Sequence, residues 1–356
     1  MDLDRRGFLA LAPGVAALST SGAQAMAGPA PRNDLTDIAG LQVGSAEDET
    51  VKTGTSVVLC ETPFTAAVDV RGGGACTRET DVMNPAGLVE TVDAITLSGG
   101  SVYGLAAADA VCAAIGAEGG GYALFDVDGI PASPIVPAAC LYDLANGGDK
   151  AWGTRPPYRE LGFAALEDAR RSNPVRIGRV GAGLGAGAGT HPGALGSASW
   201  TLDNGTTVAA LVAVNCFGSV TLPGQDEVYW AWPFEVGNEF GGQRPATDQA
   251  FELEDWGAAK FNPGARTQTT LAVVATDAVL SRDETRRFAV MAQDGLARAI
   301  RPVHAPVDGD VVFALSGGSQ TVEEPRPISL SVLGAVAADC LTRAVARGVH
   351  AARQAG

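Results

Sequence analysis

Short apolar runs without a single charged residue are the feature that most constrains how this chain folds. Three of them are rich in Val, Leu and Ala: Val208–Val214, Leu271–Ala275 and Val311–Leu315. Runs of this length and composition are typical of buried β-strands. Three further apolar runs are also strand candidates, of which the second contains one charged residue: Ser56–Cys60, Ala66–Val70 and Ala94–Leu97.

Helical patterns alternate with these strands. An Ala-rich helix is expected over about 105–115, a second over 159–171, and a long closing helix over 329–352, after Pro325 and Pro327. Ser281 and Glu284 have the spacing of a capping box, which predicts a helix start. With 356 residues the chain is long enough for one large domain or two medium ones. Alternating strands and helices predict layered α and β structure. The sequence shows no internal repeat of roughly 20–50 residues.

Composition and charge exclude several classes of function. Hydrophobic residues make up 46% and charged residues 18%, which is a globular composition. The net charge of −15 argues against nucleic acid and against an anionic membrane surface as partners. Three histidines and six scattered cysteines show no metal-ligand spacing, so we expect no metal and no cofactor. The cysteines are interpreted as free thiols, and a disulfide bond between two of them is kept as an alternative.

The N-terminus has the features of an export signal. Arg5 and Arg6 precede a short apolar region, and Ala23-Gln24-Ala25 has the form of a cleavage site. We therefore predict a twin-arginine signal peptide over residues 1–25 and a periplasmic protein. No later segment is expected to qualify as a membrane helix.

A stretch dominated by Gly, Ala and Ser runs from Gly178 to Ser199. Its first part matches a loose dinucleotide-binding pattern, but no strand leads in and no helix follows. The better interpretation is backbone packed very closely against another element.

The residues Thr267-Gln268-Thr269-Thr270 stand where a loop meets a buried strand. The region 241–265 before them is expected to be an exposed linker, in which a chain cut is tolerated. A cut between Gln268 and Thr269 would give an N-terminus with both a hydroxyl and a free amine, which can perform acyl transfer without a histidine base. Taken alone, two threonines at a strand start are more often ordinary β-formers.

Four other polar residues occupy places where chemistry is possible. Asn215 ends an apolar strand, so its amide could donate to an oxyanion, but a strand-end turn is the commoner role. Asp308 and Asp310 flank a glycine before a strand and could orient a hydroxyl and an amine, or simply form a turn. Tyr142 follows an apolar strand and could equally be a half-buried core aromatic.

The order of these motifs resembles the self-processing DmpA-type aminopeptidases, a family that includes L-aminopeptidase/D-esterases, β-peptidyl aminopeptidases and nylon-oligomer hydrolases. The resemblance covers about residues 33–350. It rests on these segments: Val70–Gly74 with Glu79–Asp81, Asn84-Pro85, Leu97–Leu105, Ile135–Ala139, Gly181–Gly189 with Gly196–Ser199, Val214-Asn215, Thr269–Asp277 and Asp308–Asp310.

The resemblance implies an α+β fold, a four-layer αββα sandwich that is Ntn-hydrolase-like with DmpA-type topology. It also implies self-cleavage between Gln268 and Thr269 into an α subunit (26–268) and a β subunit (269–356). Thr269 would be the nucleophile, with Asn215, Tyr142, Asp308 and Asp310 around it. Relatives act on small amide, ester or peptide substrates and assemble as homo-oligomers of αβ units.

The chain departs from that family in two places. Relatives usually have Asn or Gly before the cut, where this chain has Gln268. The nylon-hydrolase branch has a lysine after the glycine stretch, where Thr190 stands here, and no nearby lysine is expected to replace it. That departure motivates an alternative, a binding protein on the same fold with weak or no turnover. A serine hydrolase lacks the Gly-x-Ser-x-Gly elbow, and the choice among substrates stays open.

Overall fold

The structure is a computed structural model that describes residues 27–125, 127–246, 255–260 and 269–355. The expected signal peptide and Gln268 lie outside these residues. The helices are α1 (Ala106–Ala117), α2 (Tyr158–Ala169), α3 (Arg282–Ala299) and α4 (Arg326–Gln354). The longer strands are β1 (Leu41–Asp48), β2 (Thr53–Val70), β4 (Thr91–Ser98), β8 (Ala194–Thr201), β9 (Thr207–Asn215), β12 (Thr269–Ala278) and β13 (Val311–Gln320). The shorter strands are β3 (Thr77–Arg78), β5 (Ala138–Cys140), β6 (Gly187–Ala188), β7 (His191–Pro192), β10 (Thr221–Leu222) and β11 (Gln225–Tyr229).

Strand β2 joins two halves of one mixed sheet. The strand order is β3-β5-β4-β2-β13-β12-β9-β8, and β1 pairs with β2 outside this path. The first part of β2 pairs with β1 and β4, and its last residues, Thr65–Val70, pair with β13. The two halves turn their inner faces to one another, as the shared hydrophobic cluster of Val58, Ile95, Leu211 and Phe313 shows.

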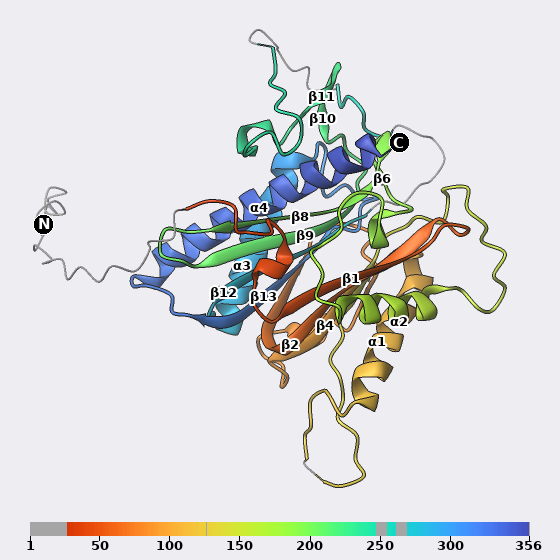
Figure 1. Cartoon of the computed structure of the whole chain (residues 1–356), viewed down its shortest axis with the longest axis vertical. Coiled ribbons are helices and arrows are strands. Elements are labelled where there is room, and N and C mark those ends of the chain that lie inside the picture. The colour runs from red at the N-terminus through yellow and green to blue at the C-terminus, as the bar shows by residue number, and fades with distance from the viewer. Residues whose placement is uncertain (1–26, 126, 247–254, 261–268, 356) are drawn as a thin grey trace, which may run out of the picture.

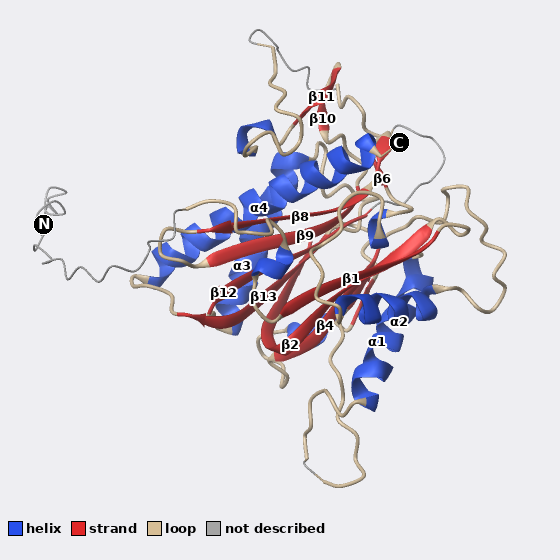
Figure 2. Ribbon diagram, viewed as in Figure 1, coloured by secondary structure: helices blue, strands red, loops and turns tan. Residues whose placement is uncertain are grey.

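Helices cover both outer faces, which gives four layers (Figures 1 and 2). Helices α3 and α4 pack on the half formed by β8, β9, β12 and β13, and α1 and α2 pack on the half formed by β1, β2 and β4. Three main hydrophobic clusters fill the three interfaces. The predicted αββα sandwich is therefore present.

The apolar runs serve both faces of their strands. In β9 and β12, Val212 and Val274 face α3 and α4, whereas Leu211 and Val273 face the other half of the sheet. Successive side chains of a strand point to opposite faces. A strand covered on both faces therefore has no polar position, which explains the charge-free runs.

Most predicted elements are confirmed, with differences at the strands. The segments 56–60 and 66–70, predicted as two strands, are parts of the single strand β2. Strand β1 was not predicted, because its polar residues interrupt the apolar pattern. The capping box is confirmed: Ser281 Oγ accepts a hydrogen bond from Glu284 N, and Glu284 Oε2 accepts one from Ser281 N.

The glycine stretch is packed against backbone, as predicted. A Cβ added at Gly183 would collide with the backbone of Ala194 and Leu195, and one added at Gly196 would collide with Ala344 O of α4. The stretch also contains most of β8, which the sequence pattern does not show.

Helix α4 corrects the expectation about later membrane segments. Within the described residues it is the one helix long and apolar enough to cross a membrane. Many of its apolar residues, including Leu333, Leu341 and Val345, are buried in the cluster shared with α3 and the sheet, whereas Ile328 and Val332 near its start are exposed. The apolar character of α4 therefore serves the protein core.

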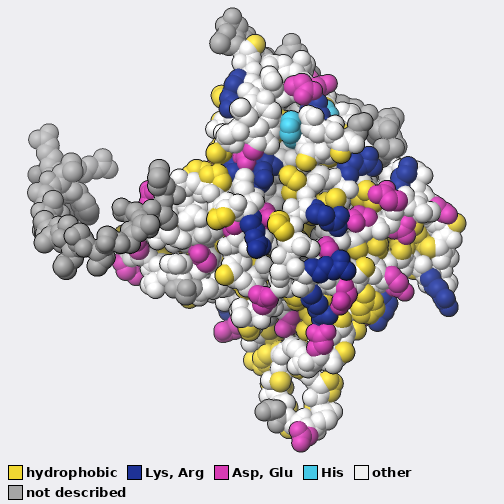
Figure 3. Space-filling view, viewed as in Figure 1, with side chains coloured by type: hydrophobic (Ala, Val, Ile, Leu, Met, Phe, Trp, Pro, Cys, Tyr) yellow, Lys and Arg dark blue, Asp and Glu magenta, His cyan; other side chains and the backbone are white. Residues whose placement is uncertain are grey.

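On the face shown in Figure 3, basic side chains are interspersed with acidic ones.

Candidate active site

Thr269 is the first residue of β12, a strand with neighbours on both sides. Its antiparallel partner in β9 is Asn215, the last residue of that strand. Both side chains are buried, each about 3% exposed. The sheet therefore brings together two predicted site residues that are 54 positions apart in the sequence.

The amide of Asn215 is held from both ends. Its Oδ1 accepts a hydrogen bond from Gly187 N (3.0 Å) and a long one from Lys260 Nζ (3.4 Å). Its Nδ2 donates to the main-chain oxygen of Tyr142 (3.0 Å). Tyr142 thus reaches the site through its carbonyl group. One N–H of the Asn215 amide remains for another acceptor.

The two predicted carboxylates lie in the loop that leads into β13, each 1% exposed. Asp310 Oδ1 accepts from Thr270 N (2.8 Å), next to the expected nucleophile. Asp310 Oδ2 is 3.0 Å from His304 N and 2.8 Å from His304 Nδ1. Asp308 accepts from Phe217 N (3.2 Å) and Ala305 N (3.1 Å).

The pKa of Asp308 is raised to about 6, mainly by burial and also by the neighbouring charge of Asp310. Backbone hydrogen bonds and the Lys260 ammonium oppose the shift. A carboxyl group with such a pKa changes its protonation state near neutral pH, as a general base does.

Gly309, between the two carboxylates, lies against the hydroxyl of Thr269. A Cβ added at Gly309 would be 2.7 Å from Thr269 Oγ1 and 2.7 Å from Gly74 O. The predicted glycine loop after β2 holds this segment, because Gly72 N donates to Asp310 O (3.2 Å) and Gly74 N donates to Asp308 O (2.7 Å). Gly309 and Gly72 thus allow a backbone approach that a side chain would prevent, since a Cβ added at Gly72 would be 2.1 Å from Asp310 N. Gly74 has room for a Cβ.

Lys260 is the residue that sequence reasoning missed, and the expectation that no lysine lies near the site is wrong. It belongs to the region predicted as an exposed linker, yet Ala259 is buried and Lys260 N donates to Phe217 O (2.9 Å). No sequence signal marks this docking. His304 was also missed, although its place four residues before Asp308 would have justified considering it.

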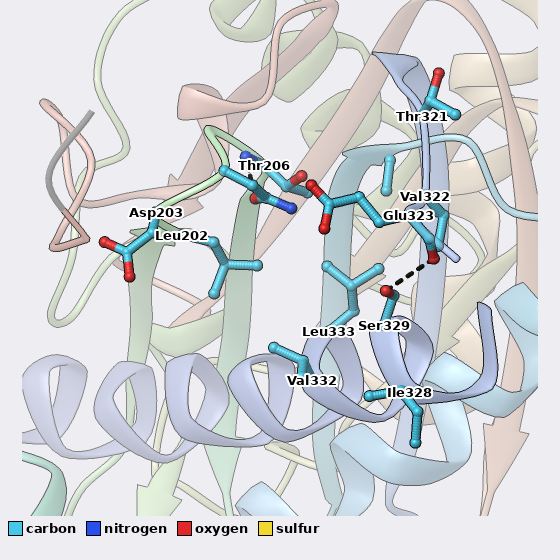
Figure 4. Close-up of a pocket in the computed structure, with 12 residues that line it drawn as sticks. Leu202, Asp203, Thr206, Thr321, Val322, Glu323, Ile328, Ser329, Val332 and Leu333 are labelled. Carbon is cyan, nitrogen blue, oxygen red and sulfur yellow. Dashed lines mark hydrogen bonds between the residues drawn. The ribbon is translucent and has the colours of Figure 1, made fainter. Parts of the chain in front are cut away.

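Within the described residues no group of three or more His, Cys, Asp or Glu side chains could hold a metal ion. A separate pocket of about 280 Å³ lies between the β8–β9 turn and the start of α4 (Figure 4). It includes Ala278, at the other end of β12 from Thr269, which is about 30 Å along an extended strand. That pocket is therefore not part of the site around Thr269.

Comparison with known proteins places this chain in a family. The sequence profile of peptidase family S58 matches residues 33–356. An uncharacterised aminopeptidase of Mycobacterium bovis is 40% identical over 334 residues, which cover 89% of this chain and 93% of the relative. A 6-aminohexanoate-oligomer endohydrolase of a Kocuria species is 27% identical over 325 residues, with 87% and 84% covered.

Solved structures show the same fold. A Burkholderia β-aminopeptidase superposes with a TM-score of 0.66 at 22% identity, covering 91% of this chain and 88% of the other. The L-aminopeptidase D-Ala-esterase/amidase of Ochrobactrum anthropi, described as a variant of the Ntn-hydrolase fold, superposes with a TM-score of 0.64 at 20% identity, with 90% and 86% covered. The four-layer α+β sandwich is thus Ntn-hydrolase-like with DmpA-type topology. The family profile and the mycobacterial relatives together establish that this chain belongs to peptidase family S58, the DmpA-type family, and is a hydrolase of the aminopeptidase type.

Proposed function

We propose that the protein is a self-processing amidohydrolase that cleaves itself between Gln268 and Thr269 and then uses Thr269 as an N-terminal nucleophile. The observation that carries this proposal is the position of Thr269. It begins a central strand opposite Asn215, and the Gly309 backbone lies against its hydroxyl. A buried threonine with polar neighbours on both sides is held for attack on a carbonyl group.

In the first stage the Thr269 hydroxyl attacks the carbonyl carbon of Gln268. The nitrogen of Thr269 is still an amide and cannot accept the proton, so another base is needed. Asp308 is our candidate, because its pKa of about 6 leaves it mostly ionised at neutral pH. The Gln268–Thr269 C–N bond then breaks, Asp308 returns the proton to the leaving nitrogen, and the α-amine of Thr269 is freed while Gln268 is held as an ester on the Thr269 hydroxyl. Water hydrolyses this ester, which releases the Gln268 carboxylate and regenerates the hydroxyl.

In the second stage the new α-amine takes the hydroxyl proton while Thr269 attacks the substrate. A free α-amine has a pKa of about 7.7–8.0, so a useful fraction is neutral near pH 7. The remaining N–H of Asn215 donates to the oxyanion, a contact typically worth about 3 kcal/mol. Water hydrolyses the acyl-enzyme. Asp310 acts as a positioning residue, because it holds Thr270 N and His304.

The substrate class we propose is small amino-acid amides, esters or peptides. The related proteins named aminopeptidase and 6-aminohexanoate-oligomer endohydrolase support amide-bond cleavage. The alternative of a binding protein was motivated by the missing lysine at Thr190. Lys260 at the site removes that motive.

Substitution of the nucleophile tests the proposal. Intact mass and a denaturing gel should show two fragments for the wild type, the smaller one beginning at Thr269, and one full-length chain for Thr269→Ala. The control is Thr270→Val, since Thr270 is buried and its hydroxyl has no partner among the described residues. That variant should cleave normally. Release of p-nitroaniline from amino-acid anilides then separates an enzyme from a binder, and cleavage of Thr269→Ala would refute the assignment.

The remaining parts of the proposal concern export and assembly. We propose removal of residues 1–25 by the twin-arginine route, a periplasmic location, and a homo-oligomer of αβ units. The loop after α1 projects from the fold and exposes Leu124, Phe125, Val127 and Ile130, which supports a subunit contact (Figure 1). Cell fractionation with Arg5→Lys/Arg6→Lys tests the export, and light scattering of Phe125→Ser tests the assembly.

A further inference from the structure

We propose that Lys260 is a positioning residue of this site, which orients the Asn215 amide through a hydrogen bond from its ammonium group to Asn215 Oδ1. It stands on the large fragment, nine positions before Thr269. The inference rests on the proposed function and extends it, because it gives a role to a segment that the sequence pattern presents as a linker.

The first observation is that the backbone around Lys260 is docked. Lys260 N donates to Phe217 O (2.9 Å), just after β9, and Thr190 N donates to Ala258 O (2.8 Å). Ala259 between them is buried. A Cβ added at Gly189 would collide with Ala258 O, so the close approach requires glycine there. The direction of the Lys260 side chain is therefore set by hydrogen bonds on two sides.

The second observation is that Lys260 distinguishes the two ends of the Asn215 amide. An ammonium group only donates hydrogen bonds, and so does Gly187 N. Both lie at Oδ1 of Asn215. A flipped amide would place its NH2 group against two donors and its oxygen against the Tyr142 carbonyl. Lys260 thus helps to keep the amide nitrogen available for an oxyanion.

The third observation is the charge around the site. Asp308 and Asp310 are both buried, and buried carboxylates require compensating charge or hydrogen bonds. The imidazole of His304 contacts the Asp310 carboxylate. The positive charge of Lys260 lowers the pKa of Asp308 and also that of the Cys216 thiol. Gly187 leaves room for the lysine, since a Cβ there would be 3.3 Å from Lys260 Cε.

The location of these bonds also has a consequence after cleavage. The hydrogen bonds that dock the segment involve residues 258 and 260, and the proposed cut falls after residue 268. Cutting the chain breaks none of them. The same ammonium therefore serves both the self-cleavage and the later turnover.

The test compares Lys260→Met and Lys260→Ala with Lys52→Met, a control at an exposed lysine. We expect Lys260→Met to lower kcat for an amino-acid anilide at least 30-fold while KM changes less than threefold. Lys52→Met should stay within twofold of the wild type. Ethylammonium at 50–100 mM should raise kcat of Lys260→Ala at least fivefold and leave Thr269→Ala inactive.

A Lys260→Met enzyme with kcat within threefold of the wild type overturns the inference. So does a Lys260→Ala protein that ethylammonium does not reactivate, which keeps the test decisive if the methionine variant folds poorly. Either result leaves the proposed function standing as long as the wild type cleaves and Thr269→Ala does not.

Discussion

Thr269 and Asn215 face each other across the β12–β9 pairing, the first residue of one strand opposite the last residue of the other. Hydrogen bonds along the two strands fix this relationship, and the four-layer core on both sides makes it rigid. The chemistry proposed here needs the hydroxyl and the amide at a constant separation. A register position between two central strands meets that need better than a loop does.

We predict that replacing Asn215 and removing the Tyr142 hydroxyl have very different effects. Asn215→Ala removes the proposed oxyanion donor and leaves the Tyr142 carbonyl without its partner, so kcat should fall by 100-fold or more. Tyr142→Phe keeps the carbonyl that holds Asn215, and kcat should stay within about threefold. Steady-state kinetics with an amino-acid anilide measure both. A large loss of kcat in Tyr142→Phe would show that the phenol itself takes part.

Gly309→Ala should inactivate the protein without unfolding it. The added methyl group would lie 2.7 Å from Thr269 Oγ1 and must displace the nucleophile or its own loop. A shift of about 1 Å at a reacting group costs on the order of 100-fold in rate. The matched control is Gly74→Ala, whose methyl group would come no closer than 3.6 Å to Asp308 O. Equal activity of the two variants would contradict this geometry.

Self-cleavage should become faster as the pH rises from 5 to 7. The Asp308 pKa of about 6 means that its carboxylate fraction grows from about a tenth at pH 5 to about nine-tenths at pH 7. The α-amine does not exist before the cut, so it cannot contribute to this profile. Precursor made by cell-free synthesis and shifted to buffers of different pH can be followed on denaturing gels.

Asp308→Asn should cleave slowly at every pH and lose the slope between pH 5 and pH 7. A wild-type rate that falls over this range would show that the neutral carboxyl is the active form. It would also exclude Asp308 as the base.

Ser281→Ala should lower the free energy of unfolding by about 1 kcal/mol, since it removes the cap of α3. Ser281 follows the end of β12 opposite to Thr269, so activity should not change. Ser331→Ala is the control, because the Ser331 hydroxyl only bonds back to Pro327 O within α4. Urea titration followed by circular dichroism measures both, and equal stabilities would show that the cap contributes nothing.

Much of the fold could be predicted, because strands that are buried on both faces appear in the sequence as apolar runs without charged residues. The runs at 208–214, 271–275 and 311–315 correspond to β9, β12 and β13, and the helix start at Ser281 follows from local capping. Strand β1 could not be predicted in this way. It gains its stability from pairing along its full length with β2, which no local pattern shows.

The candidate site was predictable where residues lie at or just before the end of a strand. Asn215 ends β9, Thr269 begins β12, and Asp308 and Asp310 lie in the loop just before β13; the structure brings all four together. Lys260 follows no strand and fits no motif. Its position depends on two backbone hydrogen bonds, one from Lys260 N to Phe217 O and one from Thr190 N to Ala258 O. Phe217 and Thr190 stand 43 and 70 positions before Lys260, so these contacts form only when the chain folds.

The strand order has a consequence for what a cut chain could do. Strands β12 and β13 lie between β9 and β2, and both of these flanking strands come from the part of the chain before residue 268. A small fragment that begins at Thr269 would therefore contribute two strands to the interior of a sheet whose flanking strands belong to the large fragment. The two fragments could dissociate only if the hydrogen bonds between β2 and β13 and those between β12 and β9 broke together. Proteolysis at this junction would break the chain but keep the fold. The product would be a permanent non-covalent heterodimer of the two fragments.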